Sequence, residues 1–140
     1  MLRAFKTEIH PTKEQRIKIN QTIGNCRFIY NYFISYNKEL YETNKNTNLI
    51  TFMDNRTFRK YMNHDEVFLS EHPWLKSVSS KSIDYALSYA YGAFKKFFDG
   101  KANFPKFKKK KQQKVKAHFV KNSKTDLIVE RHRIKVPTIG

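Results

Sequence analysis

Cysteine, acidic residues and long apolar runs are all scarce in this sequence of 140 residues, and each shortage excludes a class of protein. Cys26 is the single cysteine, which excludes an internal disulfide and a cysteine-based zinc site. The five histidines show no ligand spacing, so we expect them on the surface and expect no bound metal. No apolar run approaches the roughly 20 residues of a membrane span, and the N-terminus lacks the apolar core of a signal peptide. We therefore expect a cytoplasmic protein that has no membrane partner.

The shortage of acidic residues leaves the chain strongly basic. Lys and Arg total 28 against 12 Asp and Glu, which gives a formal net charge of +16. A field of this size attracts polyphosphate, because each neutralised phosphate releases condensed counterions. An A+T-rich genome enriches Lys, Asn, Ile, Tyr and Phe, but that bias does not explain why acids are so few. The composition therefore predicts a nucleic-acid partner.

Groups suited to catalysis are also scarce. A two-metal nuclease needs several carboxylates that converge on ions about 3.5–4 Å apart, whereas the acids here are scattered along the chain. The sequence contains no Gly-rich phosphate loop, no nucleophile elbow and no Ser/His/Asp set. We expect no catalytic residue, no cofactor and no enzymatic activity in this chain by itself.

The pattern of apolar residues predicts an α+β chain that begins with a strand and a long helix. Residues 3–10 alternate like a half-buried strand, and Thr12 with Gln15 has the spacing of a helix capping box. The helix extends to about Tyr41, and its predicted inner face is Ile19, Ile23, Cys26, Tyr30 and Phe33. Gly24 costs this helix about 1 kcal/mol relative to Ala, so we expect it to permit close packing or close backbone approach.

Two more helices and three more strands are predicted further along. Asp54 caps a short helix, and Ser79 or Ser80 caps a longer helix that ends at a glycine cap, Gly100. Alternation then predicts strands at residues 115–119, 127–129 and 134–136, the last two around a turn near 131–132. We expect the first strand of the chain to pair with these last ones.

A segment rich in lysine and phenylalanine follows the third helix. Between Lys95 and Lys121 there are eleven lysines and one acid, Asp99. Lysines can pair with phosphates, while the interleaved phenylalanines either pack the core or stack on bases. Spacing favours the core for the rings, whereas the run 108–111 lacks balancing acids and is predicted to contact nucleic acid rather than form a solvated loop.

The start of the third helix is a second candidate contact. A helix N-terminus carries partial positive charge and free N–H groups, which suit phosphate or groove contact. Lys81 and Asp84 lie on its polar face, and Asp84 can accept a hydrogen bond from a cytosine amine. Ordinary solvent exposure is the alternative. Asn25, Arg27 and Asn31, near the polar side of the first helix, are candidates on the same footing.

Three segments of the chain together resemble a known family. They are RAFKTEIHPTKEQRIKINQTIGNCRFIYNYF, HPWLKSVSSKSIDYALSYAYGAFKKFFDGKANFPKFKKKK and ERHRIKVPTIG. In this order they resemble TnpB-like RNA-guided nucleases of bacterial insertion sequences, which are related to type V CRISPR effectors. The first segment is similar to the part of those proteins labelled as a transposase helix-turn-helix.

The resemblance implies both a fold and a function. The fold would be an oligonucleotide-binding-like β-barrel, the wedge domain, interrupted by a small helical recognition domain. Its first strand would occupy residues 1–11, the helical domain 12–100, and a Lys-rich loop with further wedge strands 101–140. The chain would bind a transposon-derived guide RNA and a short double-stranded DNA motif beside the target, while base pairing reads the longer sequence. The RuvC-like nuclease of the family, with its divalent metal ions and zinc ribbon, is expected to be absent from this chain.

Roles carried over by position identify the expected contact residues. The DNA flank would be read by Phe52, Arg56, Ser80, Lys81, Asp84 and Lys121, together with Val120. RNA or the duplex backbone would lie against Lys106, Lys108, Lys109, Lys110 and Lys111. Trp74, Phe94 and Phe97 would be core residues.

Two alternatives remain open from the sequence. One is a free-standing DNA-binding regulator that uses the first helices as a helix-turn-helix. The other is a truncated transposase fragment without a selected activity, because the chain stops at Gly140 just after a strand and the barrel is expected to be incomplete. The sequence leaves the oligomeric state undetermined.

Overall fold

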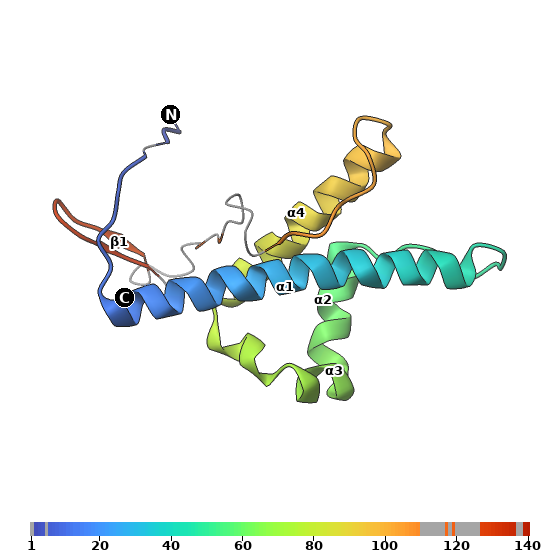
Figure 1. Ribbon diagram of the computed structural model, residues 1–140, viewed down its shortest axis with the longest axis horizontal. Coiled ribbons are helices and arrows are strands. Elements are labelled where there is room, and N and C mark those ends of the chain that lie inside the picture. The colour runs from blue at the N-terminus through green and yellow to red at the C-terminus, as the bar shows by residue number, and fades with distance from the viewer. Residues whose placement is uncertain (1, 5, 110–116, 118, 120–126, 137–138) are drawn as a thin grey trace.

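A computed structural model describes residues 2–4, 6–109, 117, 119, 127–136 and 139–140, and these are mainly helical (Figure 1). The helices are α1 (Lys13–Asn44), α2 (Asn55–His64), α3 (Glu66–Glu71), the 3-10 helix η1 (Pro73–Ser77) and α4 (Ser80–Phe98). Two short strands follow, β1 (Ile128–Val129) and β2 (Ile134–Lys135). None of the helices in this part of the chain has both the length and the apolar character needed to cross a membrane.

Helix α1 begins at the capping box that the sequence predicts. The Thr12 side chain accepts a hydrogen bond from the Gln15 amide at 3.2 Å, and the Gln15 side chain accepts one from the Thr12 amide at 2.9 Å. The helix then continues for 32 residues. Its buried residues are Thr22, Cys26, Ile29, Phe33, Ile34, Asn37 and Asn44. The predicted Ile19, Ile23 and Tyr30 lie at the edge of this face and are half-buried.

Polar residues are part of the buried face of α1, and for this reason the face differs from the purely apolar one that the sequence predicts. Asn37 donates a hydrogen bond to the Phe33 carbonyl at 3.1 Å and accepts one from the Met53 amide at 2.7 Å. Thr22 donates to the Lys18 carbonyl at 2.9 Å. Polar side chains are tolerated inside a protein when they are hydrogen-bonded. A pattern built only on apolar residues misses them.

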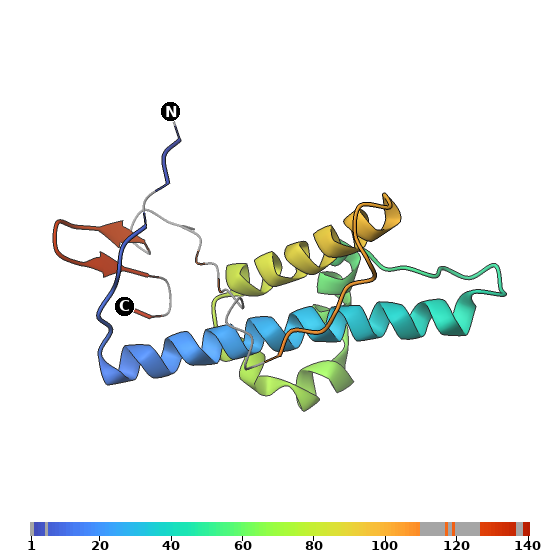
Figure 2. The same ribbon diagram turned by 45° about the horizontal axis from the view of Figure 1, so that its top comes forward.

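The core lies where α1 packs against α4, with α2 alongside (Figures 1 and 2). The ring of Phe33 on α1 meets Phe58 on α2 at 5.3 Å and Phe94 on α4 at 5.8 Å between centroids, edge-on in both cases. All three are buried, and each contributes about 1.5–3 kcal/mol of hydrophobic stabilisation. Asp54 caps α2 as predicted, because its carboxylate accepts a hydrogen bond from the Thr57 amide at 2.8 Å.

The predicted inner face of α4 is confirmed as far as Phe94, where Ile83, Leu87 and Ala90 are also buried. The helix ends at the predicted glycine, since Gly100 adopts a φ of 72°. The Lys101 amide donates to the Lys96 carbonyl at 2.8 Å, and the Gly100 amide donates to the Phe97 carbonyl at 3.0 Å. These two bonds form a Schellman motif, whose left-handed residue favours glycine.

The predicted oligonucleotide-binding-like β-barrel is wrong. Among the described residues, 2–4 and 6–10 form no strand, and the sheet consists of the hairpin β1–β2, with Ile128 opposite Lys135. Alternation makes residues 3–10 compatible with a strand, but a strand also needs a partner for its backbone groups, and a barrel needs enough strands to close. The hairpin around residues 131–132 is confirmed. The predicted strand at 115–119 falls largely outside the described residues.

Three aromatic residues depart from their expected surroundings. Trp74 and Phe97, predicted in the core, are partly exposed, whereas Phe94 is buried as expected. His72, predicted on the surface, is half-buried, and its ring lies 4.5 Å from that of Phe68 and 5.7 Å from that of Trp74. His72 therefore packs as an aromatic ring, a role that the spacing of the histidines in the sequence does not indicate.

Candidate nucleic-acid interface

The most basic described stretch is the segment of residues 101–109, here called the Lys segment. It leaves the C-terminal end of α4 after the Schellman turn and runs back along α4 toward α1 (Figure 2). Lys101, Lys106 and Lys109 are exposed on it, and Lys108 is half-buried. The path of this segment therefore determines where its positive charges lie.

Asn31 on α1 holds the Lys segment through both polar groups of its side-chain amide. Its Nδ2 donates to the Lys108 carbonyl at 2.8 Å, and its Oδ1 accepts from the Lys108 amide at 2.7 Å. The Lys108 Nζ lies 5.1 Å from the centroid of the adjacent Tyr30 ring, within cation–π range. The amide thus satisfies both backbone groups of one lysine, in the manner of a neighbouring strand.

Apolar contacts fix the middle of the same segment. The Phe104 ring lies 5.5 Å from that of Phe94 and 5.4 Å from that of Phe97, edge-on in both cases. Pro105, the next residue, is buried. Because Phe104, Pro105 and the backbone of Lys108 face the helices, the side chains of Lys101, Lys106 and Lys109 remain at the surface.

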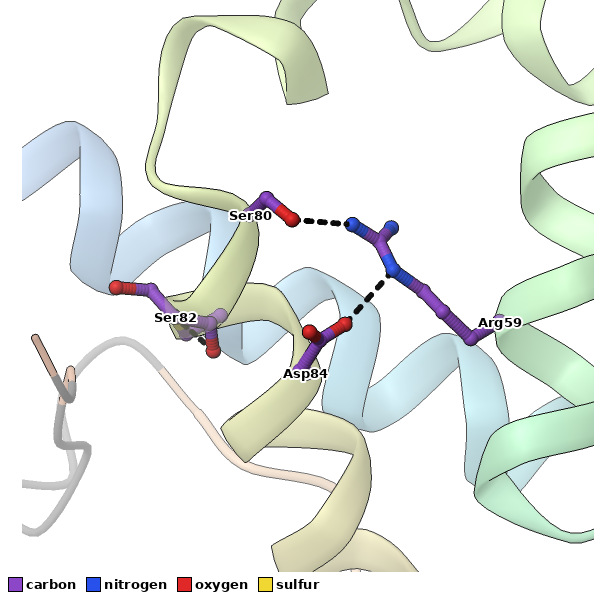
Figure 3. A network of polar contacts seen from close by, with 5 residues as sticks. Arg59, Ser80, Ser82 and Asp84 are labelled. Carbon is purple, nitrogen blue, oxygen red and sulfur yellow. Dashed lines mark hydrogen bonds and ion pairs between the residues drawn. The ribbon is translucent and has the colours of Figure 1, made fainter. Parts of the chain in front are cut away.

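A second polar cluster joins α2 to the start of α4 (Figure 3). The Arg59 Nε lies 2.8 Å from the Asp84 Oδ1, and the Arg59 Nη2 donates to the Ser80 hydroxyl at 3.3 Å. Arg59 thereby offsets the charge of Asp84 and occupies one of its acceptor atoms. Lys81, between these two α4 residues in the sequence, is exposed.

Sequence reasoning missed Arg59, although a signal was present. Arg56, one of the predicted contact residues, is exposed in the first turn of α2, and Arg59 follows it by three residues, on the same side of the helix. Ser79 is the N-cap of α4 but makes no side-chain capping bond. The cluster therefore places a guanidinium beside the α4 start, where the sequence alone indicated only the α4 residues.

The remaining predicted residues lie in different surroundings, and some lie outside the described residues. Phe52 is half-buried, and its ring centroid lies 5.1 Å from that of Phe94 and 5.2 Å from that of Phe98. Its side chain therefore packs at the edge of the core. Asn25 donates to the Trp74 carbonyl at 3.3 Å, and Arg27 is half-buried. Lys110, Lys111, Val120 and Lys121 lie outside the described residues.

Groups with redox or metal chemistry do not gather at either cluster. Burial raises the pKa of the Cys26 thiol to about 11, and its Sγ lies 3.6 Å from the Ser82 carbonyl oxygen, to which it donates. In the part of the chain that the structure describes, no three His, Cys, Asp or Glu side chains form a group able to hold a metal ion. The described surface is suited to charge and hydrogen-bond contacts.

Comparison with known proteins places the chain in a family. Residues 1–46 match the model of the helix-turn-helix domain of the IS605 OrfB type. Over 147 residues the chain is 26% identical to the "Putative RNA-guided DNA endonuclease InsQ" of Escherichia coli K12, a match that covers 99% of this chain and 32% of that protein. A "Putative RNA-guided DNA endonuclease" of Streptomyces pristinaespiralis is 26% identical over 125 residues, which cover 88% of this chain and 29% of that protein. The chain belongs to the TnpB-like family.

The relatives of this chain occur at different lengths. The chain spans about a third of the two endonuclease relatives. It is also 31% identical over 117 residues to the "Virulence protein VsdF" of Salmonella dublin, and there the match covers 79% of this chain and 95% of the relative. Homology therefore extends over most of this TnpB-like chain, both with long relatives and with a relative of similar length.

The region matched by the helix-turn-helix model has a simple geometry in this TnpB-like chain. Helix α1 runs unbroken from Lys13 to Asn44, and no second helix occurs among the described residues of 1–46. A helix-turn-helix unit requires two helices joined by a short turn. The matched region therefore supplies one helix of any such unit, and Asn31 on that helix is the residue that holds the Lys segment.

Proposed function

We propose that this chain is the nucleic-acid-binding part of a TnpB-like protein and that it binds a transposon-derived guide RNA and a short double-stranded DNA motif beside the target. The observation that carries the proposal is the Lys segment, held to α1 by Asn31 so that its lysines lie at the surface of a chain of net charge +16. Two relatives whose names include RNA-guided DNA endonuclease support it.

The two polar clusters suggest different contacts. Lysines of the Lys segment pair with phosphates and carry no sequence information, and Lys110 and Lys111, next in the chain, extend the same charge. The start of α4, with Ser80, Lys81 and the neighbouring Arg59, is suited to reading the DNA flank. We assign Arg56, Asp84 and Lys121 to this second contact and give Phe52 a supporting role through its packing. Cleavage, in this proposal, belongs to parts of longer family members.

A free-standing DNA-binding regulator is the second candidate, favoured by the helix-turn-helix description of the matched domain. The unbroken α1 speaks against it, because residues 1–46 hold a single described helix. Binding of a specific duplex in the absence of RNA would support the regulator. Duplex binding that is wholly salt-sensitive and blind to sequence would contradict the regulator.

Co-expression with RNA tests the proposal directly. The full chain is produced together with RNA from its transposon end and with an unrelated RNA of equal length, and the RNA retained through purification is quantified by sequencing. We expect selective retention of the transposon-end RNA. Equal retention of both RNAs would contradict guide-RNA binding and leave only a general affinity for polyanions.

A further inference from the structure

Three exposed phenylalanine rings lie next to one another at the C-terminal end of α4. Phe97, Phe98 and Phe104 are 38%, 58% and 39% exposed. The Phe97 ring centroid lies 5.8 Å from that of Phe98 and 5.4 Å from that of Phe104. We call these three residues the aromatic end. The sequence pattern favoured the core for such rings, and the structure instead leaves a large part of each at the surface.

Neighbouring residues hold the aromatic end in place. The Phe98 ring lies 5.2 Å from that of Phe52 and 6.0 Å from that of Phe94, while Phe104 lies 5.5 Å from Phe94. Phe94 is buried, so it forms a fixed floor under the exposed rings. The Schellman turn at Gly100 sets the direction of the backbone between Phe98 and Phe104. The rings are therefore preorganised before any partner arrives.

Exposed lysines lie close to the same rings in the sequence. Residues 95–106 contain four lysines, Lys95, Lys96, Lys101 and Lys106, and one acid, Asp99, all of them exposed. Contiguous exposed apolar surface with a polar rim is a feature of interaction sites. Proteins bind single-stranded nucleic acids with two elements: aromatic rings that stack on the bases, and positive charges that pair with the phosphates.

We propose that the aromatic end stacks on unpaired bases of a single-stranded nucleic acid whose phosphates pair with the surrounding lysines. Base pairing and stacking within a duplex hide the faces of the bases, so only an unpaired stretch presents them to the rings. This inference deepens the proposed function, since it rests on the chain binding nucleic acid, and it assigns the unpaired part of that ligand to one end of α4.

Base removal provides the test, because it separates stacking from charge. The affinity of the full chain is measured for a short labelled oligonucleotide and for its abasic counterpart of equal length and charge, each in ribose and deoxyribose form. The wild type should prefer the base-containing form by about 5- to 150-fold, the range expected for the stacking of one base. F98L should lose most of this preference, while F98Y should keep it. Y41L, at an exposed aromatic residue of α1, is the matched control and should behave like the wild type.

Each outcome decides between distinct conclusions. Equal affinity for base-containing and abasic forms would overturn the stacking site and leave the proposed nucleic-acid binding intact. Absence of binding to every form would overturn both. If the wild type sediments as a dimer and F98L as a monomer of unchanged base preference, the aromatic end is a self-association surface and the proposal fails. Preference for the ribose or the deoxyribose form, when it depends on bases and on Phe98, supports the proposal and identifies the ligand as RNA or DNA.

Discussion

Replacing Asn31 by Ala should release the Lys segment from α1 and leave the core intact. The side chain makes two hydrogen bonds with the backbone of Lys108, at 2.8 and 2.7 Å, in a partly buried position. Each such bond contributes about 0.5–1.5 kcal/mol net, so N31A should lower the free energy of local opening by about 1–3 kcal/mol. That loss corresponds to an increase of about 5- to 150-fold in the open population of the segment.

Amide hydrogen exchange measures this opening, because the Lys108 amide donates directly to Asn31. Its protection should fall in N31A, while amides buried in the core of α1 and α4 should keep theirs. N20A is the matched control, since Asn20 is exposed on the same helix and its replacement brings the same gain in helix propensity. Unchanged protection of Lys108 in N31A would refute the holding role of Asn31.

Binding offers a second measurement on the same variant. N31A keeps every lysine, so the number of phosphates contacted, and with it the salt slope, should stay nearly constant. The affinity should nevertheless fall, because a released segment must be ordered again when it binds. A changed salt slope at unchanged affinity would mean that Asn31 does not act by positioning the segment.

Three further predictions concern stability. In a double-mutant cycle of R59A and D84N, the coupling free energy between the two side chains should be about 0.5–1 kcal/mol, because both are partly exposed. A coupling of zero, measured by urea denaturation, would contradict the pairing. G92A should stabilise the chain by about 1 kcal/mol, since a Cβ there meets no atom of the described residues within 4 Å; a lower urea midpoint would refute this. Burial raises the pKa of Cys26 from 9.0 to about 11, so the folded state retains a proton that the unfolded state loses. Stability should therefore fall as pH rises from 9.0 to about 11, and a C26A variant that shows the same fall would exclude this cause.

Local chemistry made much of the helical part predictable. The capping box of Thr12 and Gln15 and the Asp54 cap each depend on residues three positions apart, and the glycine cap depends on Gly100 itself. Such signals lie within one turn of the chain and do not require knowledge of the fold. The buried face of α4 followed equally well from its apolar spacing.

Contacts between distant residues were not predictable from the sequence in the same way. Asn31 and Lys108 are 77 positions apart, and nothing in either neighbourhood indicates that an amide on α1 pairs with that backbone. Strand pairing is also non-local, which is why the alternating pattern at residues 3–10 predicted a strand that the described residues 6–10 do not form. The close packing expected at Gly24 is likewise not found among the described residues, where a Cβ would lie 3.7 Å from the Arg27 side chain, an ordinary contact distance.

The salt dependence of RNA binding tests most directly whether the Lys segment is the interface. A variant with Lys101, Lys106, Lys108 and Lys109 replaced by Ala is compared with a control of equal net charge, in which the exposed Lys13, Lys38, Lys60 and Lys76 are replaced. Each lost phosphate contact lowers the slope of log affinity against log salt by about 0.7 for a single strand. We expect a slope reduced by about 2–3 in the first variant and a nearly unchanged slope in the control. Equal reductions in both would show that the overall field of the chain, and not the Lys segment, accounts for binding.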